Sequence, residues 1–63
     1  MKARSGPIIV KIEYSIAETN VETFLDMMRQ RRRVQRRVGA RHWNLQRDLR
    51  EPSLWTETFR TPT

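Results

Sequence analysis

The first patterned segment of the chain begins after Pro7, where apolar residues alternate with polar ones. Five apolar residues are spaced two apart, and most of them are β-branched: Ile8, Val10, Ile12, Tyr14 and Ile16. In an extended chain these five side chains share one face, and the residues between them point to the other. A period of two with these residue types predicts a β-strand.

The next segment changes to a helical period. Apolar side chains recur at i, i+3, i+4 and i+7, in the order Val21, Phe24, Leu25 and Met28. Three further residues widen the apolar stripe along one side: Met27, Val34 and Val38. This spacing predicts an amphipathic helix whose apolar stripe faces the core.

Both ends of this helix carry residues that are typical of caps. Thr19 and Glu22 have the spacing of a capping box, and Asn20 is an alternative N-cap. Gly39 follows the last apolar position, where glycine commonly ends a helix. We therefore expect the helix to run from about residue 20 to about residue 38.

Two more strands are expected after the helix. In residues 40–49 the apolar residues Trp43, Leu45 and Leu49 alternate with polar ones, which is typical of a half-buried strand. Residues 54–60 alternate in the same way. The segment between them contains Pro52 and predicts a turn, so the two strands should form a hairpin.

Together these elements predict an α+β fold, in which the order strand–helix–strand–strand makes half of a ferredoxin-like domain. A right-handed crossover would join the first two strands, and the third would pair antiparallel between them. We expect residues 7–63 to form this single βαββ domain and residues 1–6 to be a flexible lead-in. One sheet face should pack on the helix. The other is expected to be hydrophobic and bare, so that a second copy must cover it.

The composition narrows the class of protein. Sixty-three residues allow one domain, and the absence of cysteine excludes disulfides and thiolate metal sites. A single histidine cannot build a zinc site alone. So small a domain is marginally stable, which favours self-association as a homodimer. The apolar run at residues 8–10 is too short for a signal peptide or a membrane span, so we expect a cytoplasmic location.

The net charge of +6 favours an anionic partner. Six of the thirteen cations lie in the helix, where Arg31 is nearest the apolar stripe and five others share one outward sector. These five are candidate anion contacts: Arg29, Arg32, Arg33, Arg36 and Arg37. The expected partner is an anionic membrane surface or an acidic protein. Nucleic acid is less favoured, because no aromatic residue is interleaved with the arginines. A merely solvated helix face is the alternative.

No recognisable catalytic arrangement is present in the sequence. His42 should point away from Trp43 on a strand, so the two should not face one cavity. There is no paired-carboxylate site and no nucleophile–base pair, and only Gly6 and Gly39 could serve a phosphate-binding loop. We therefore expect no cofactor, and the sequence favours a protein that is not an enzyme.

Four residues of the last two strands are candidate interface or pocket residues: Trp43, Trp55, Glu57 and Phe59. Large aromatic side chains of this kind anchor cores and interfaces. Glu57 lies between two of them, so on a buried face it needs a cation. Arg41, Arg47 or an arginine of a second copy could supply that cation. An exposed position at a sheet edge is the alternative for Glu57.

Several short segments, taken in order, resemble a known family. They are residues 9–16 for the opening strand, 24–29 and 31–37 for the helix, and then 39–40, 43–45, 47–49, Pro52 and 57–59. Over residues 8–60 they resemble the C-terminal cytoplasmic domain of the major facilitator permeases called transmembrane secretion effectors. That domain is similar in fold to the antibiotic biosynthesis monooxygenases, which are dimeric α+β barrels.

The resemblance implies a non-enzymatic, self-associating module that acts through protein–protein or regulatory contacts, and that is tied to the membrane through a permease. A cofactor-independent monooxygenase or a small-ligand-binding dimeric barrel is one alternative, and nucleic-acid binding through the arginines is another. Family members continue into a second helix and a fourth strand. The resemblance therefore implies that the first strand of this chain is an exposed edge, which pairs with another protomer.

Overall fold

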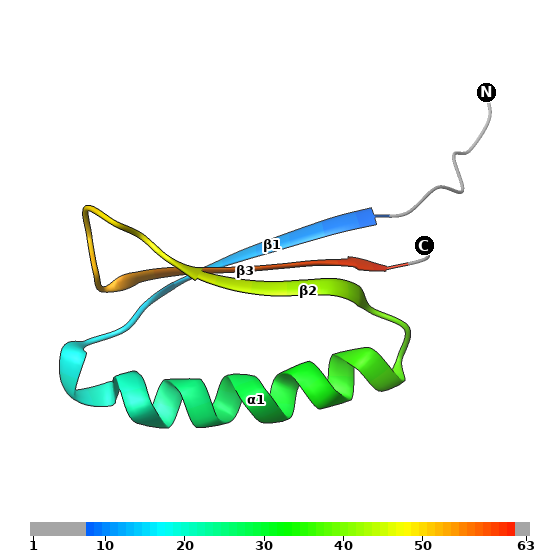
Figure 1. Ribbon diagram of the computed structural model, residues 1–63, viewed down its shortest axis with the longest axis horizontal. Coiled ribbons are helices and arrows are strands. Elements are labelled where there is room, and N and C mark those ends of the chain that lie inside the picture. The colour runs from blue at the N-terminus through cyan, green and yellow to red at the C-terminus, as the bar shows by residue number, and fades with distance from the viewer. Residues whose placement is uncertain (1–7, 62–63) are drawn as a thin grey trace.

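The computed structural model describes residues 8–61, and the lead-in expected at residues 1–6 lies outside them. The elements follow one another as β1 (Ile8–Ser15), a 3₁₀ turn η1 (Glu18–Asn20), α1 (Val21–Arg37), β2 (Arg41–Arg47) and β3 (Leu54–Thr61). Figure 1 shows α1 lying along one face of a single sheet. The predicted order of strand, helix, strand and strand is confirmed.

The sheet has the predicted topology. Its strands lie in the order β1-β3-β2, and β3 pairs antiparallel with both neighbours. Glu57, in the middle of β3, has Ile12 of β1 on one side and Leu45 of β2 on the other. Alternate side chains of three strands therefore converge under the helix around this central position.

The hydrophobic core lies between the sheet and α1. Phe24 and Met28 of the helix are buried against Trp55 of β3. The Phe24 ring lies 5.2 Å from the Tyr14 ring and 5.4 Å from the Trp55 ring, centroid to centroid. Both pairs are tilted, which is a favourable geometry for aromatic rings. Tyr14, Ile16, Val21, Leu25, Trp43 and Leu45 pack around this centre and are partly buried.

The sheet face turned away from α1 is polar, so the prediction of a hydrophobic bare face is wrong. Period-two alternation places most apolar side chains of the three strands on the helix side and leaves only Ile9 and Leu54, at the two ends of the sheet, on the other. The uncovered face carries Lys11 and Glu13 from β1, Asn44 from β2, and Thr56 and Thr58 from β3. Such a face can remain in contact with water, and it does not require a second copy to cover it.

The helix starts differently from the prediction and ends as predicted. Asn20 is the N-cap residue by position, but its side chain makes no capping hydrogen bond within the described chain. The capping box at Thr19 and Glu22 is wrong, because η1 occupies residues 18–20 and makes Glu22 the second helical residue. At the other end Gly39 has a φ of 101°. This left-handed conformation, which glycine adopts without a steric penalty, lets the chain turn back toward the sheet.

The second strand is shorter than predicted. It ends at Arg47, because the Asp48 carboxylate accepts backbone hydrogen bonds from Arg50 at 2.9 Å and from Glu51 at 2.7 Å. An aspartate that binds the backbone two residues ahead starts a turn. Leu49, which was expected on the apolar side of the strand, lies in this turn and is 96% exposed.

The start of β2 contains a β-bulge. The register moves from Arg41 opposite Arg60 to Asn44 opposite Thr58, so that two residues of β2 oppose one residue of β3. Inside the bulge His42 has a φ of 57°, in the left-handed region. Histidine is among the residues enriched there, but the conformation is uncommon for any residue with a side chain. The bulge therefore changes where His42 points relative to Trp43.

Candidate functional site

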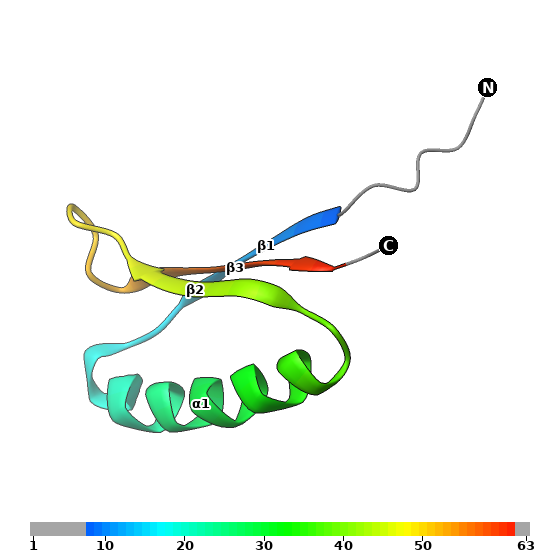
Figure 2. The ribbon, with the colours of Figure 1, turned by 45° about the vertical axis from the view of Figure 1, so that its right-hand side comes forward.

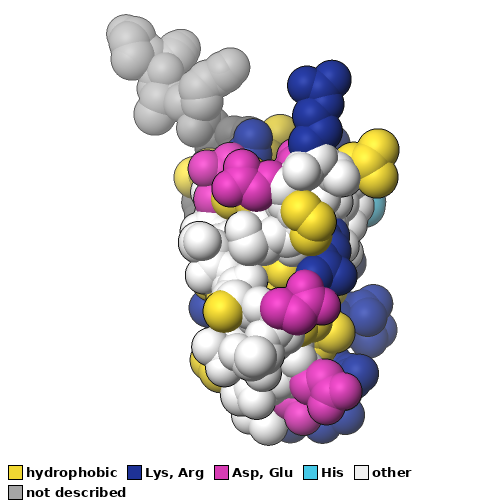
Figure 3. Space-filling view, turned by 90° about the vertical axis from the view of Figure 1, so that its left-hand side faces the viewer, with side chains coloured by type: hydrophobic (Ala, Val, Ile, Leu, Met, Phe, Trp, Pro, Cys, Tyr) yellow, Lys and Arg dark blue, Asp and Glu magenta, His cyan; other side chains and the backbone are white. Residues whose placement is uncertain are grey.

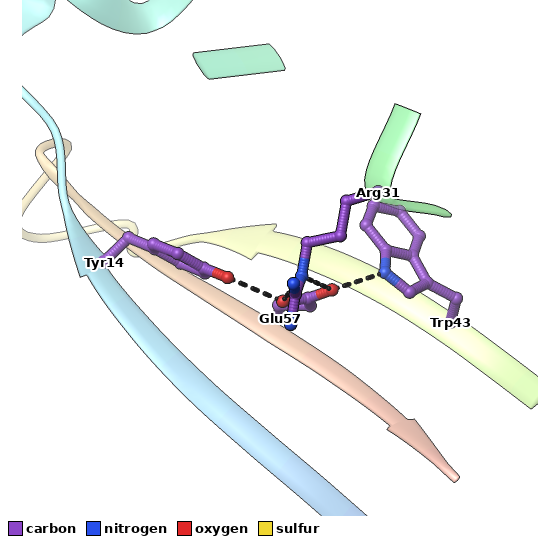
Figure 4. Close-up of polar contacts among 4 residues, drawn as sticks. All are labelled: Tyr14, Arg31, Trp43 and Glu57. Carbon is purple, nitrogen blue, oxygen red and sulfur yellow. Dashed lines mark hydrogen bonds and ion pairs between the residues drawn. The ribbon is translucent and has the colours of Figure 1, made fainter. Parts of the chain in front are cut away.

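A buried carboxylate organises the space between helix and sheet. Glu57 is 0% exposed, and three side chains donate hydrogen bonds to it. The Tyr14 hydroxyl lies 2.7 Å from its Oε1, the Trp43 Nε1 lies 2.7 Å from its Oε2, and the Arg31 Nε lies 2.9 Å from both oxygens. Figure 4 shows these three side chains converging on the carboxylate. We call these four residues the Glu57 cluster.

The Glu57 cluster takes one residue from each of the four main elements. Tyr14 comes from β1, Arg31 from α1, Trp43 from β2 and Glu57 from β3. Every oxygen of the buried charge has a donor, and Arg31 supplies a compensating positive charge, which is what a buried carboxylate requires. The cluster therefore links all four elements at a single point.

The partner of Glu57 is Arg31 and not Arg41 or Arg47, which were the cations considered from the sequence. The alternative of an exposed edge position is also wrong, because Glu57 is completely buried on the central strand. The signal in the sequence is the helical position of Arg31, nearest the apolar stripe. A long arginine side chain there can lay its stem on the core and turn its guanidinium inward.

The Glu57 cluster perturbs Tyr14. Burial, and then the hydrogen bond to the neighbouring carboxylate, raise the pKa of the Tyr14 hydroxyl above its ordinary value of 10.0, and the positive charge of Arg31 opposes them. The folded state consequently holds this proton to a higher pH than the unfolded state does. The linked stability is present below about pH 10 and is lost as the pH rises above that value.

We therefore expect the free energy of unfolding to fall above about pH 10, and to fall less steeply in Tyr14→Phe. Urea titrations over a series of alkaline pH values, carried out on both proteins, measure the two slopes. The two proteins differ only at residue 14, so the effect of every other group cancels in the difference. Equal slopes would contradict the assignment.

The other candidate interface or pocket residues lie on the sheet face that α1 covers. Trp55 and Phe59 are buried, and Trp43 is half-buried. The Arg47 guanidinium lies 4.9 Å from the centre of the Trp55 ring, a cation–π arrangement. The Trp55 Nε1 has no hydrogen-bond partner within residues 8–61. A role of these residues in an interface stays a prediction.

One flank of the helix borders an apolar groove of about 760 Å³. It lies between α1 and the β1 side of the sheet, and its walls include Tyr14, Ile16, Phe24, Met27 and Val34. Met27 is 62% exposed and Val34 is 58% exposed, which is unusual for two apolar side chains so close together. We call this feature the β1-side groove.

Five arginines of α1 lie on the helix surface outside the β1-side groove. All five candidate anion contacts are exposed: Arg29, Arg32, Arg33, Arg36 and Arg37. Arg29 forms an ion pair with Asp26, and the Arg32 guanidinium lies 5.5 Å from the centre of the Trp43 ring. Their exposure agrees with the outward sector expected from the sequence, and contact with an anion stays a prediction.

The opposite flank of the helix borders a polar hollow of about 500 Å³. Arg32 and Arg36 of α1 and Arg41, His42 and Trp43 of β2 line it. His42 and Trp43 thus face one hollow, contrary to the prediction from simple alternation, because the bulge intervenes between them. We call this feature the arginine hollow. Figure 2 brings this end of the molecule forward and shows the chain curving from α1 into β2.

The charge distribution along the molecule is uneven. Exposed carboxylates lie at the end formed by η1 and the β2–β3 turn: Glu18, Glu22, Asp48 and Glu51. Figure 3 looks onto this end and shows the acidic side chains spread over it. The arginine hollow lies at the other end, between the last turns of α1 and the start of β2. One end of the molecule is consequently much more basic than the other.

Two classes of site find no support in residues 8–61. They contain no group of three or more histidine, aspartate or glutamate side chains arranged to hold a metal ion. Within the same range no helix is both long enough and apolar enough to cross a membrane.

Comparison with known proteins gives one match. The family model described as transmembrane secretion effector matches residues 1–63, which is the whole of the sequence. No curated protein matches the chain, and no solved structure matches it.

Proposed function

Because the chain belongs to the transmembrane secretion effector family, we propose that it is a non-catalytic contact module of such an effector, which pairs with a second copy through β1. The proposal includes the cytoplasmic location expected from the sequence. The observation that carries it is the free edge of β1 beside the β1-side groove. An edge strand bordered by exposed apolar side chains is a surface to which another chain readily adds.

The charges along β1 favour a second copy as the occupant. If β1 pairs antiparallel with the β1 of a second copy, centred on Ile12, each Lys11 stands opposite a Glu13 of the other copy. Opposite charges across a strand pair contribute about 0.2–1 kcal/mol each. The same register puts Val10 opposite Tyr14, so that apolar side chains meet on the helix side.

The placement of the arginines is compatible with this pairing. Among residues 8–61, Arg31 is the only arginine that lines the β1-side groove, and Glu57 balances its charge. The five exposed arginines of the helix lie away from the groove. Two copies of a chain with a net charge of +6 can therefore meet along β1 without opposing their arginine runs.

A charge-swap series tests the proposal. We expect sedimentation equilibrium to show dimers at concentrations of tens of micromolar, and Lys11→Glu to weaken dimerisation about tenfold because both cross-strand pairs become like-charged. The double variant Lys11→Glu/Glu13→Lys restores the opposite pairing and should recover most of the affinity. Both residues are exposed on the polar sheet face, so the fold should survive the changes.

A matched control is Arg33→Gln, which changes an exposed charge outside both β1 and the groove and should leave the dimer intact. A protein that stays monomeric at these concentrations would overturn the proposal. So would a dimer that does not respond to the swap.

A further inference from the structure

The arginine hollow gathers positive charge that the rest of the described chain does not neutralise. Among residues 8–61 the ion pairs engage Arg29, Arg31 and Arg47, and none engages Arg32, Arg36 or Arg41. None of the carboxylates in the described part of the chain lines the hollow. Arg32 and Arg36 are also four residues apart on α1, a spacing at which like charges repel. An external anion would relieve this repulsion.

The strand side of the hollow adds to the same charge. Arg41 stands opposite Arg60 in the sheet register, so two cations face each other across neighbouring strands. Like charges in this position are unfavourable unless something binds between or beside them. The basic character of this end is therefore not confined to the helix.

The walls of the hollow are held in place. The Arg32 guanidinium lies over the Trp43 ring in a cation–π contact, and the Trp43 ring is held in turn by its hydrogen bond to Glu57. A guanidinium held by its contact with a ring can still donate hydrogen bonds, which suits the two-pronged recognition of a phosphate. His42 supplies another polar wall from a left-handed backbone conformation, and such conformations are concentrated at ligand sites.

From this arrangement we propose that the arginine hollow binds a phosphate group, and that the phosphate is that of an anionic lipid headgroup. The site is separate from the β1 edge and goes beyond the contact function proposed above. Membership of a transmembrane effector family brings the domain within reach of a lipid surface. A soluble phosphate ester offers the same chemistry. Nucleic acid is disfavoured, because Trp43 is the only aromatic residue lining the hollow among residues 8–61 and the Arg32 guanidinium already lies over its ring.

Two double variants, each removing two positive charges, test the site. Arg36→Gln/Arg41→Gln changes the hollow, and Arg33→Gln/Arg37→Gln changes the outward sector of the same helix. All four side chains are exposed, and amide spectra establish that both variants are folded. Binding is measured by cosedimentation with vesicles of phosphatidylcholine alone and with vesicles that also contain phosphatidylglycerol.

We expect binding only to the anionic vesicles. The hollow variant should bind the vesicles about 30-fold more weakly than the wild type, because each lost arginine near a lipid surface weakens the attraction by about fivefold. The outward variant should lose much less affinity, because its two arginines lie outside the hollow. Equal losses in the two variants mean that the whole basic surface attracts the membrane, and they overturn the proposal.

A second arm identifies the source of the phosphate. Glycerol phosphate is titrated into the labelled wild-type chain while amide shifts are followed. Shifts confined to Arg32 and residues 36–43, together with vesicle binding, support the lipid headgroup. The same shifts without vesicle binding support the phosphate site but overturn the lipid as its ligand. No shifts at these residues, or tighter binding to an oligonucleotide than to the vesicles, overturns the site.

Discussion

Replacing Glu57 with alanine is expected to lower the free energy of unfolding by about 2–4 kcal/mol, because it leaves the partly exposed Arg31 guanidinium and two half-buried donors without an acceptor. At about 0.05–0.15 kcal/mol per residue, a chain of this size has a total stability of about 3–9 kcal/mol. The variant should therefore lose a large part of its stability. Circular dichroism with urea titration measures the loss.

Two further variants show what causes the loss of stability in Glu57→Ala. Glu13→Ala removes the same side chain from the exposed face of the neighbouring strand, and its effect should stay within about 0.5 kcal/mol. Glu57→Gln keeps the size of the side chain and removes the charge, so its effect should lie between the two. If Glu57→Ala is as stable as Glu13→Ala, the Glu57 cluster does not hold the elements together.

Phe24→Ala is expected to cost about 3–5 kcal/mol through the cavity that it leaves in the core. Phe24 is 6% exposed and contacts both the Tyr14 and Trp55 rings, so the loss affects the helix and two strands at once. Thermal unfolding followed by tryptophan fluorescence measures it. The emission of Trp55 should also shift to the red as water reaches its ring.

Met27→Ala is the control for this experiment. Met27 lies one turn further along the same helix and is 62% exposed, so its truncation should change the stability by less than about 1 kcal/mol. A comparable loss in both variants would mean that the β1-side groove is as well packed as the core, and it would contradict the burial described above.

The strand, helix and hairpin could be predicted because each carries a clear period. The first strand follows from the alternation that starts at Ile8. The helix follows from the apolar stripe through Phe24 and Met28, and the glycine at position 39 marks its end. The placement of β3 in the middle followed from connection rules, which leave few arrangements for so short a chain. The polar sheet face was also readable from Lys11 and Glu13, although the prediction assumed that an uncovered face would be apolar.

The site could be predicted only in part. Periodicity indicates that Glu57 shares a face with Trp55 and Phe59, but it does not tell which cation reaches that face from another element. That depends on how α1 is rotated over the sheet, which only the packing decides. The bulge at His42 has no glycine to mark it, so simple alternation failed there and the arginine hollow was missed. The turn begun by Asp48 ended β2 early by a local hydrogen bond that competes with strand pairing.

The central place of β3 has a consequence for biosynthesis. β1 is made before β2, but its sheet partner is β3, which leaves the ribosome after both. The ends of a long loop must therefore meet before β1 can pair with β3, which slows folding relative to helical domains of similar size. Until β3 is made, the nascent chain exposes two unpaired strands. A truncation that removes β3 would therefore remove every strand pair of the sheet, because β1 and β2 each pair only with β3.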